Sequence, residues 1–87
     1  MAYNFRILTH QNSENVHLKL MGDFDGSSAC ELLNALKTYS NRANRVFIHT
    51  DGLKDVDVFG KLVFQSDFSE ISQQPGGFVF TGEKLAP

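Results

Sequence analysis

The apolar residues of this 87-residue chain change their spacing along the sequence, and that change constrains the fold most. Residues 3–8 and 16–20 alternate in character from one position to the next, which is typical of β-strands. Between residues 29 and 40 the apolar side chains recur every three to four positions, which predicts a helix packed on one side. Residues 46–48 form a continuous apolar run, which indicates a strand buried on both faces.

Turn residues divide the rest of the chain into the same kinds of element. The polar run at residues 10–15 predicts a hairpin loop, and residues 49–57 predict a second loop. Ser28 and Glu31 have the spacing of a capping box at the start of the first helix. Asp57 is a candidate cap for a second helix over residues 58–71, which ends before a Pro-Gly-Gly segment and a last strand at residues 78–80. The predicted fold class is α/β: β-β-α-β-α-β, with two helices packed on a mixed four-stranded sheet.

Composition limits the functions that such a chain can have. Ten acidic and eight basic residues give a net charge of −2, which argues against a nucleic-acid-binding protein. The single cysteine, Cys30, cannot form an intrachain disulfide, and its place beside Ala29 predicts a buried, unreactive thiol. No apolar run approaches the ~20 residues of a membrane span, and the N-terminus lacks a signal peptide. We therefore expect one cytoplasmic domain over residues 1–87, without membrane insertion.

No group of residues in the sequence predicts catalysis or a cofactor. Three histidines, His10, His17 and His49, fall on separate elements without the close spacing of zinc ligands, so no metal site is expected. Ser27 and Ser28 have the character of helix-capping residues, and no Gly-x-Ser-x-Gly motif is present. We therefore expect a protein that is not an enzyme and that binds no cofactor.

Two short motifs resemble those of a known family. Residues 22–25 read GDFD at the end of the second predicted strand, and residues 57–62 read DVFGKL at the start of the second predicted helix. In this order and context they resemble the STAS domain family, and the resemblance covers residues 3–82. The best-known members are bacterial anti-sigma-factor antagonists, which regulate transcription, and relatives occur on sulfate transporters and lipid-transport ATPases.

The departures from the family pattern concern its phosphorylation site. In the antagonists the second serine of an Asp-Ser-Ser-Gly motif accepts a phosphoryl group, but here that position is Phe59 and the preceding one is Val58. Neither side chain has a hydroxyl, so the resemblance implies that the usual switch is absent. His49 stands where the family tends to have aspartate at the end of the third strand, whereas Asp25, Asp57 and Gly60 are retained.

Phe59 has two interpretations. Its spacing to Leu62 and Val63 is that of one helix face, which favours a position in the core. An outward orientation would instead make it a hydrophobic anchor for a partner. Five aspartates also cluster in the loops at one end of the predicted sheet, where they serve either as turn and cap residues or as an acidic docking rim.

The function implied by the resemblance is a regulatory module that docks to a protein. The partner would be an anti-sigma factor of the serine-kinase type or a transporter ATPase. The candidate partner-binding residues lie in the two motifs: Asp23, Asp25, Ser27, Asp57, Val58, Phe59, Gly60 and Lys61. One alternative is a small-ligand or nucleotide-binding domain in which His49, Asp51 and Asp57 form the polar end of a shallow pocket. Another is a STAS subunit of a transporter complex.

The C-terminus adds an expectation about assembly. STAS domains usually continue into a further helix after the strand that residues 78–80 match, and this sequence has no room for it. We therefore expect uncovered apolar surface around Leu8, Phe78 and Phe80. A patch of this kind needs a partner, which makes a homodimer the expected assembly.

Overall fold

The computed structural model of the protein describes residues 4–43, 45–71 and 77–85. Of the segment expected to end the second helix, residues 73–77, residues 73–76 lie outside them. The described elements, in chain order, are β1 (Arg6–Gln11), β2 (Asn15–Phe24), α1 (Gly26–Ser40), β3 (Arg45–His49), β4 (Leu53–Val56), α2 (Val58–Ile71) and β5 (Gly77–Thr81).

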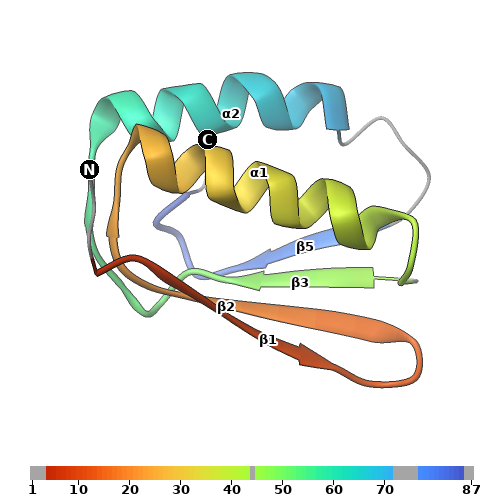
Figure 1. Cartoon of the computed structure of the whole chain (residues 1–87). Helices are drawn as coiled ribbons and strands as arrows, with labels where there is room; N and C mark the ends of the chain where they lie inside the picture. The colour runs from red at the N-terminus through yellow and green to blue at the C-terminus, as the bar shows by residue number, and fades with distance from the viewer. Residues whose placement is uncertain (1–3, 44, 72–76, 86–87) are drawn as a thin grey trace.

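The strands form one mixed sheet in the order β1-β2-β3-β5, with β4 beside the far end of β2. β1 is antiparallel to β2, and the remaining pairs are parallel. Both helices lie side by side on one face of the sheet (Figure 1). This arrangement confirms the predicted α/β class, with two helices packed on a mixed sheet.

Strand β4 occupies part of the segment that was expected to be a loop. β2 is longer than predicted and continues past Lys19, the last residue that pairs with β3. The far end of β2 therefore has backbone groups free to pair, and Gly22 and Phe24 take Leu53 and Val56 as partners. The mixed sheet consequently has five described strands rather than four.

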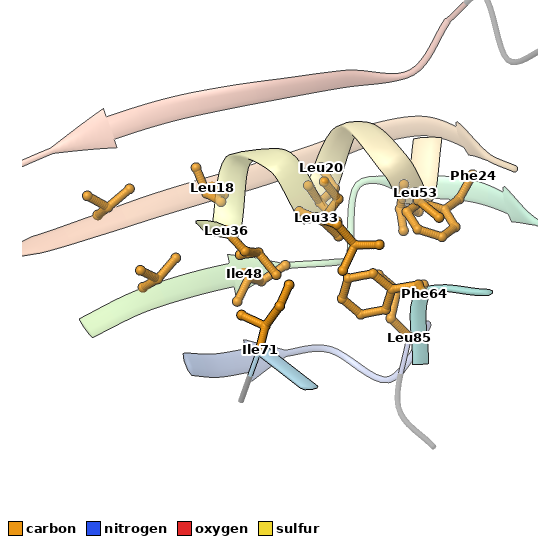
Figure 2. Close-up of a cluster of buried hydrophobic side chains, with 14 residues drawn as sticks. Leu18, Leu20, Phe24, Leu33, Leu36, Ile48, Leu53, Phe64, Ile71 and Leu85 are labelled. Carbon is orange, nitrogen blue, oxygen red and sulfur yellow. The ribbon is translucent and has the colours of Figure 1, made fainter. Parts of the chain in front are cut away.

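The core lies between the sheet and the helices, as Figure 2 shows. Alternate residues of β2 and β3, such as Leu18 and Ile48, are fully buried on the helix side. Helix α1 adds Leu32, Leu33 and Leu36 from one face, as its apolar spacing predicts. Cys30 lies off that face and is exposed, so the prediction of a buried thiol is wrong.

Aromatic side chains join α2 to the sheet. The Phe64 ring lies 6.1 Å from the Phe24 ring and 5.9 Å from the Phe80 ring, while Phe68 lies 5.4 Å from Phe78 (centroid distances). Phe78 and Phe80 are therefore half-buried under α2, and the expectation that they are uncovered is wrong. Only Leu8 of the three is exposed, so the argument for a homodimer loses most of its basis.

The chain beyond β5 folds back onto the core. Leu85 is 3% exposed and lies near Phe64 in Figure 2. The Lys84 ammonium donates a hydrogen bond to the Leu53 carbonyl of β4. These contacts tie residues 84 and 85 to β4 and to the core. Neither described helix is long and apolar enough to cross a membrane.

Candidate functional site

The two helices begin close together at one edge of the sheet, where both predicted motifs lie. The Asp57 amide, just before α2, donates a 2.8 Å hydrogen bond to the carbonyl of Phe24, just before α1. In Figure 1 both helices start at the same end of the molecule and run the same way. The topology thus brings together two segments that are more than 30 residues apart in sequence.

Asp25 is the N-cap of α1. Its Oδ1 atom accepts hydrogen bonds from the Ser28 amide at 3.0 Å and from the Ser27 hydroxyl at 2.8 Å. Helix α1 therefore starts at Gly26, and the predicted capping box headed by Ser28 is wrong. Ser28 is instead buried in the first turn, where its hydroxyl bonds the Asp23 carbonyl at 3.2 Å. The Ser28 amide, followed by the Ser27 hydroxyl, holds the pKa of the Asp25 carboxyl well below its usual range.

Acid should therefore weaken the fold through Asp25. Because the pKa is lower in the folded state, the ionised carboxylate stabilises the fold above its unfolded pKa of about 3.9, and this contribution is lost as the pH falls through the folded-state value. We expect Asp25→Asn to lower the urea concentration at the unfolding midpoint at about pH 6. Between about pH 6 and pH 3, this midpoint should fall less in the variant than in the wild type. Urea titrations across this range test it, with Asp67→Asn, an exposed site on α2, as the charge-matched control. An unchanged decline in Asp25→Asn would contradict a stabilising role of the ionised Asp25 carboxylate.

Asp57 caps α2 in the way the sequence predicts. Its Oδ2 atom accepts from the Gly60 amide at 2.9 Å, and its carbonyl accepts from the Lys61 amide at 2.9 Å. Asp25 and Asp57 therefore both serve as helix caps. Asp23 lies at the end of β2 and bonds neighbouring segments instead, with its carboxylate accepting from Asn4 and from the Asp55 amide at 3.3 Å each.

Gly60 allows α2 to approach the start of α1. A Cβ atom at this position would lie 2.5 Å from the Asp25 carbonyl carbon and 2.8 Å from its Cα and oxygen atoms. These are backbone atoms, which cannot move aside as a flexible side chain could. Only glycine, which has no Cβ atom, therefore fits at this contact. Any other residue at position 60 would push the two helix starts apart.

We expect Gly60→Ala to destabilise the protein by about 1–3 kcal/mol, the usual cost of overpacking. The clash outweighs the gain of about 1 kcal/mol in helix propensity that alanine brings. Gly26→Ala is the matched control, because a Cβ there would meet only the Phe59 ring at 3.7–3.8 Å, an ordinary contact. Chemical denaturation of both variants measures the difference, and equal stability would show that the approach is not tight.

Three large apolar side chains are exposed at the start of α2, and we call them the α2 patch: Val58, Phe59 and Leu62. Their exposed fractions are 72%, 68% and 58%. The prediction that Phe59 belongs to the core is therefore wrong. Gly60 and Phe64 instead form the buried face of α2, which turns Phe59 outward over Gly26. Leu62, which was expected to share a core face with Phe59, is exposed as well.

The structure assembles most of the predicted docking residues at the helix starts, but it does not assemble the predicted ligand pocket. The helix starts bring together Asp25, Ser27, Asp57 and residues 58–61, with Lys61 half-exposed at the margin. The alternative site is not assembled as expected. His49 and Asp51 line a hollow of about 520 Å³, but Asp57 does not, because it caps α2. The described residues contain no group of histidine, cysteine or acidic side chains that could hold a metal ion.

Comparison with known proteins identifies the fold. No protein-family model and no curated protein matches the sequence. Among solved structures, "Mglu" aligns with a TM-score of 0.75 and 14% identity over 88% of this chain and 19% of its own. A second Mglu structure, in 4.3 M NaCl, gives 0.73 and 11% over 93% of this chain and 27% of its own. The chain therefore spans about a fifth to a quarter of the Mglu chains.

An anti-sigma factor antagonist aligns with this chain over most of its own length. The unphosphorylated form of the anti-sigma factor antagonist SpoIIAA aligns with a TM-score of 0.60 and 15% identity. The alignment covers 87% of this chain and 70% of SpoIIAA. At this identity the likeness concerns the fold. The chain has a STAS-like fold, shared with SpoIIAA.

Proposed function

We propose that this protein is a non-enzymatic regulatory domain that docks to another protein through the two helix starts. The observation that carries the proposal is the α2 patch, in which three large apolar side chains stand exposed beside two rigidly capped helix ends. By its resemblance to anti-sigma-factor antagonists, the partner is an anti-sigma factor of the serine-kinase type in the bacterial cytoplasm. A transporter ATPase, with this chain as its STAS subunit, is the second candidate.

The α2 patch has the chemistry of a binding anchor. Covering an exposed Phe side chain contributes about 1.5–3 kcal/mol, and aromatic residues near the centre of an interface often dominate its affinity. Phe59 rests on Gly26 without being enclosed, so its ring can enter a pocket on a partner. Around it, Asp25, Asp57 and Lys61 supply charges that favour one orientation of the partner.

We further propose that binding is not switched by phosphorylation at the usual position. Val58 and Phe59 have no hydroxyl groups. Of the nearby hydroxyls, Ser28 is buried and Ser27 donates to Asp25, where a phosphate dianion would face a carboxylate. The protein would therefore remain competent to bind in the presence of the kinase and ATP.

Incubation with a purified serine-kinase-type anti-sigma factor from the same organism tests the proposal. We expect a complex on size-exclusion chromatography that persists after ATP is added, and no phosphate on the start of α2 by mass spectrometry. A known antagonist with an intact Asp-Ser-Ser-Gly motif serves as the control and should dissociate under the same conditions. Loss of this protein's complex on addition of ATP would contradict constitutive binding.

A further inference from the structure

The face of the sheet opposite the helices carries a second cluster of polar side chains, which includes three histidines. Both helices cover the face that buries Leu18 and Ile48, and no described helix covers the other face (Figure 1). Because side chains alternate along strands, His17 and His49 point to that other face. The strand register places His10 opposite His17 and Thr81 opposite His49.

Three of these side chains form a hydrogen-bonded row across β2, β3 and β5. Nδ1 of His17 lies 2.9 Å from Nε2 of His49, and Nδ1 of His49 lies 2.8 Å from the Thr81 hydroxyl oxygen. The planes of the two imidazoles are nearly parallel, with centroids 5.2 Å apart, and the Phe47 ring stacks on His17 at 4.6 Å. The rings are thereby held in fixed orientations before any ligand arrives.

The direction of the hydrogen bonds in the row decides whether Nε2 of His17 donates or accepts a hydrogen bond. A neutral imidazole donates from one nitrogen and accepts at the other, so the bonds in the row change direction together. When Thr81 donates to His49 and His49 donates to His17, Nε2 of His17 carries a proton and is a donor. It is also a donor when His17 is protonated. Nε2 has no hydrogen-bond partner among the residues that the structure describes.

Basic side chains outnumber acidic ones around two hollows on this face, although the net charge of the chain is negative. The hollow of about 520 Å³ is lined by the row together with His10, Lys19 and one acidic residue, Asp51. A neighbouring hollow of about 400 Å³, which shares Leu8 with the first, adds Arg6 and Lys54. Cationic and imidazole donors therefore outnumber acids on this face, which favours an anionic ligand.

We propose that this hollow binds the phosphoryl group of a free phosphate ester, held by Lys19, His17 and His10. An ammonium and separate imidazoles act as point donors, which suit the tetrahedral oxygens of a phosphoryl group, whereas a planar carboxylate is best matched by the fork of an arginine. Asp51 also lines the hollow and can accept a hydrogen bond from a ligand hydroxyl, so the ligand class is a phosphorylated sugar or nucleoside. The site lies on the opposite face from the α2 patch and does not depend on the proposed docking.

Titration with ribose 5-phosphate, followed by the imidazole NMR signals, tests the site. We expect saturable shifts at His17 and His49, and none with ribose, which lacks the phosphoryl group. Lys19→Gln should weaken binding about tenfold, the loss of one charge-assisted hydrogen bond. Lys37→Gln, an exposed site on α1 with the same change in charge, should bind as the wild type does. Both sites are exposed, so both variants should fold.

Three results would overturn the proposal. Absence of saturable shifts would mean that the row only stabilises the sheet through cross-strand pairs. Equal weakening by Lys37→Gln would indicate unspecific attraction of anions. Co-sedimentation with phosphatidic acid vesicles, without a response to ribose 5-phosphate, would assign the phosphoryl group to a lipid headgroup instead.

Discussion

Replacing Phe64 by alanine will lower the free energy of unfolding by about 3–5 kcal/mol, the typical cost of removing a buried phenylalanine. Phe64 is 1% exposed, and its ring contacts Phe24 of β2, Phe68 of α2 and Phe80 of β5. It therefore connects α2 to two strands of the sheet. A domain of 87 residues has a total stability of about 4–13 kcal/mol, so this single change removes a large part of it.

The same substitution five residues earlier provides the control. Phe59 lies on the same helix but is 68% exposed, so Phe59→Ala should change the stability by less than about 0.5 kcal/mol. Urea denaturation of the two variants, followed by circular dichroism, measures both effects in one experiment. Similar losses of stability would mean that Phe59 belongs to the core after all and that the α2 patch is not a free surface.

Phe59→Ala will nevertheless weaken binding to the anti-sigma factor by about 30-fold or more. This corresponds to the loss of roughly 2 kcal/mol that defines a dominant interface residue. The reason is that the ring is exposed before binding and would be covered by the partner, while the fold does not depend on it. Titration calorimetry with the purified anti-sigma factor measures the change in affinity.

Leu8→Ala is the matched control for this binding experiment. Leu8 is also a large exposed apolar residue, at 49%, but it lies beside the two hollows of the opposite sheet face. We expect its replacement to leave the affinity for the protein partner unchanged. A loss of affinity in Leu8→Ala that equals the loss in Phe59→Ala would place the docking surface on the sheet instead of the helix starts.

The parts of the fold that the sequence predicts correctly are those with a regular local pattern. The alternation in β2 and the three- and four-residue spacing in α1 correctly predict buried residues such as Leu18 and Leu36. The cap at Asp57 is also predictable, because capping depends on residues three positions apart. In each case the information lies within a few neighbouring residues.

Most of the errors concern features that depend on contacts between distant segments. The capping box at Ser28 is a local exception, because Asp25 caps the helix three residues earlier. Residues 53–56 form a strand only because β2 extends past β3 and leaves backbone groups to pair. Phe59 faces outward because Gly60 must contact the Asp25 backbone, which rotates the whole helix. The row formed by His17, His49 and Thr81 spans three strands, so its residues are far apart in the sequence. Local spacing carries no information about such pairings.

The most direct test of the docking proposal is a map of the surface that the partner covers. Amide NMR signals, recorded as the anti-sigma factor is added, report this surface residue by residue. We expect the affected amides to cluster at the two helix starts, at residues 25–28 and 58–62, while β1 and the sheet face around His17 are unchanged. Changes centred on His17 and Lys19, with residues 58–62 unaffected, would contradict it.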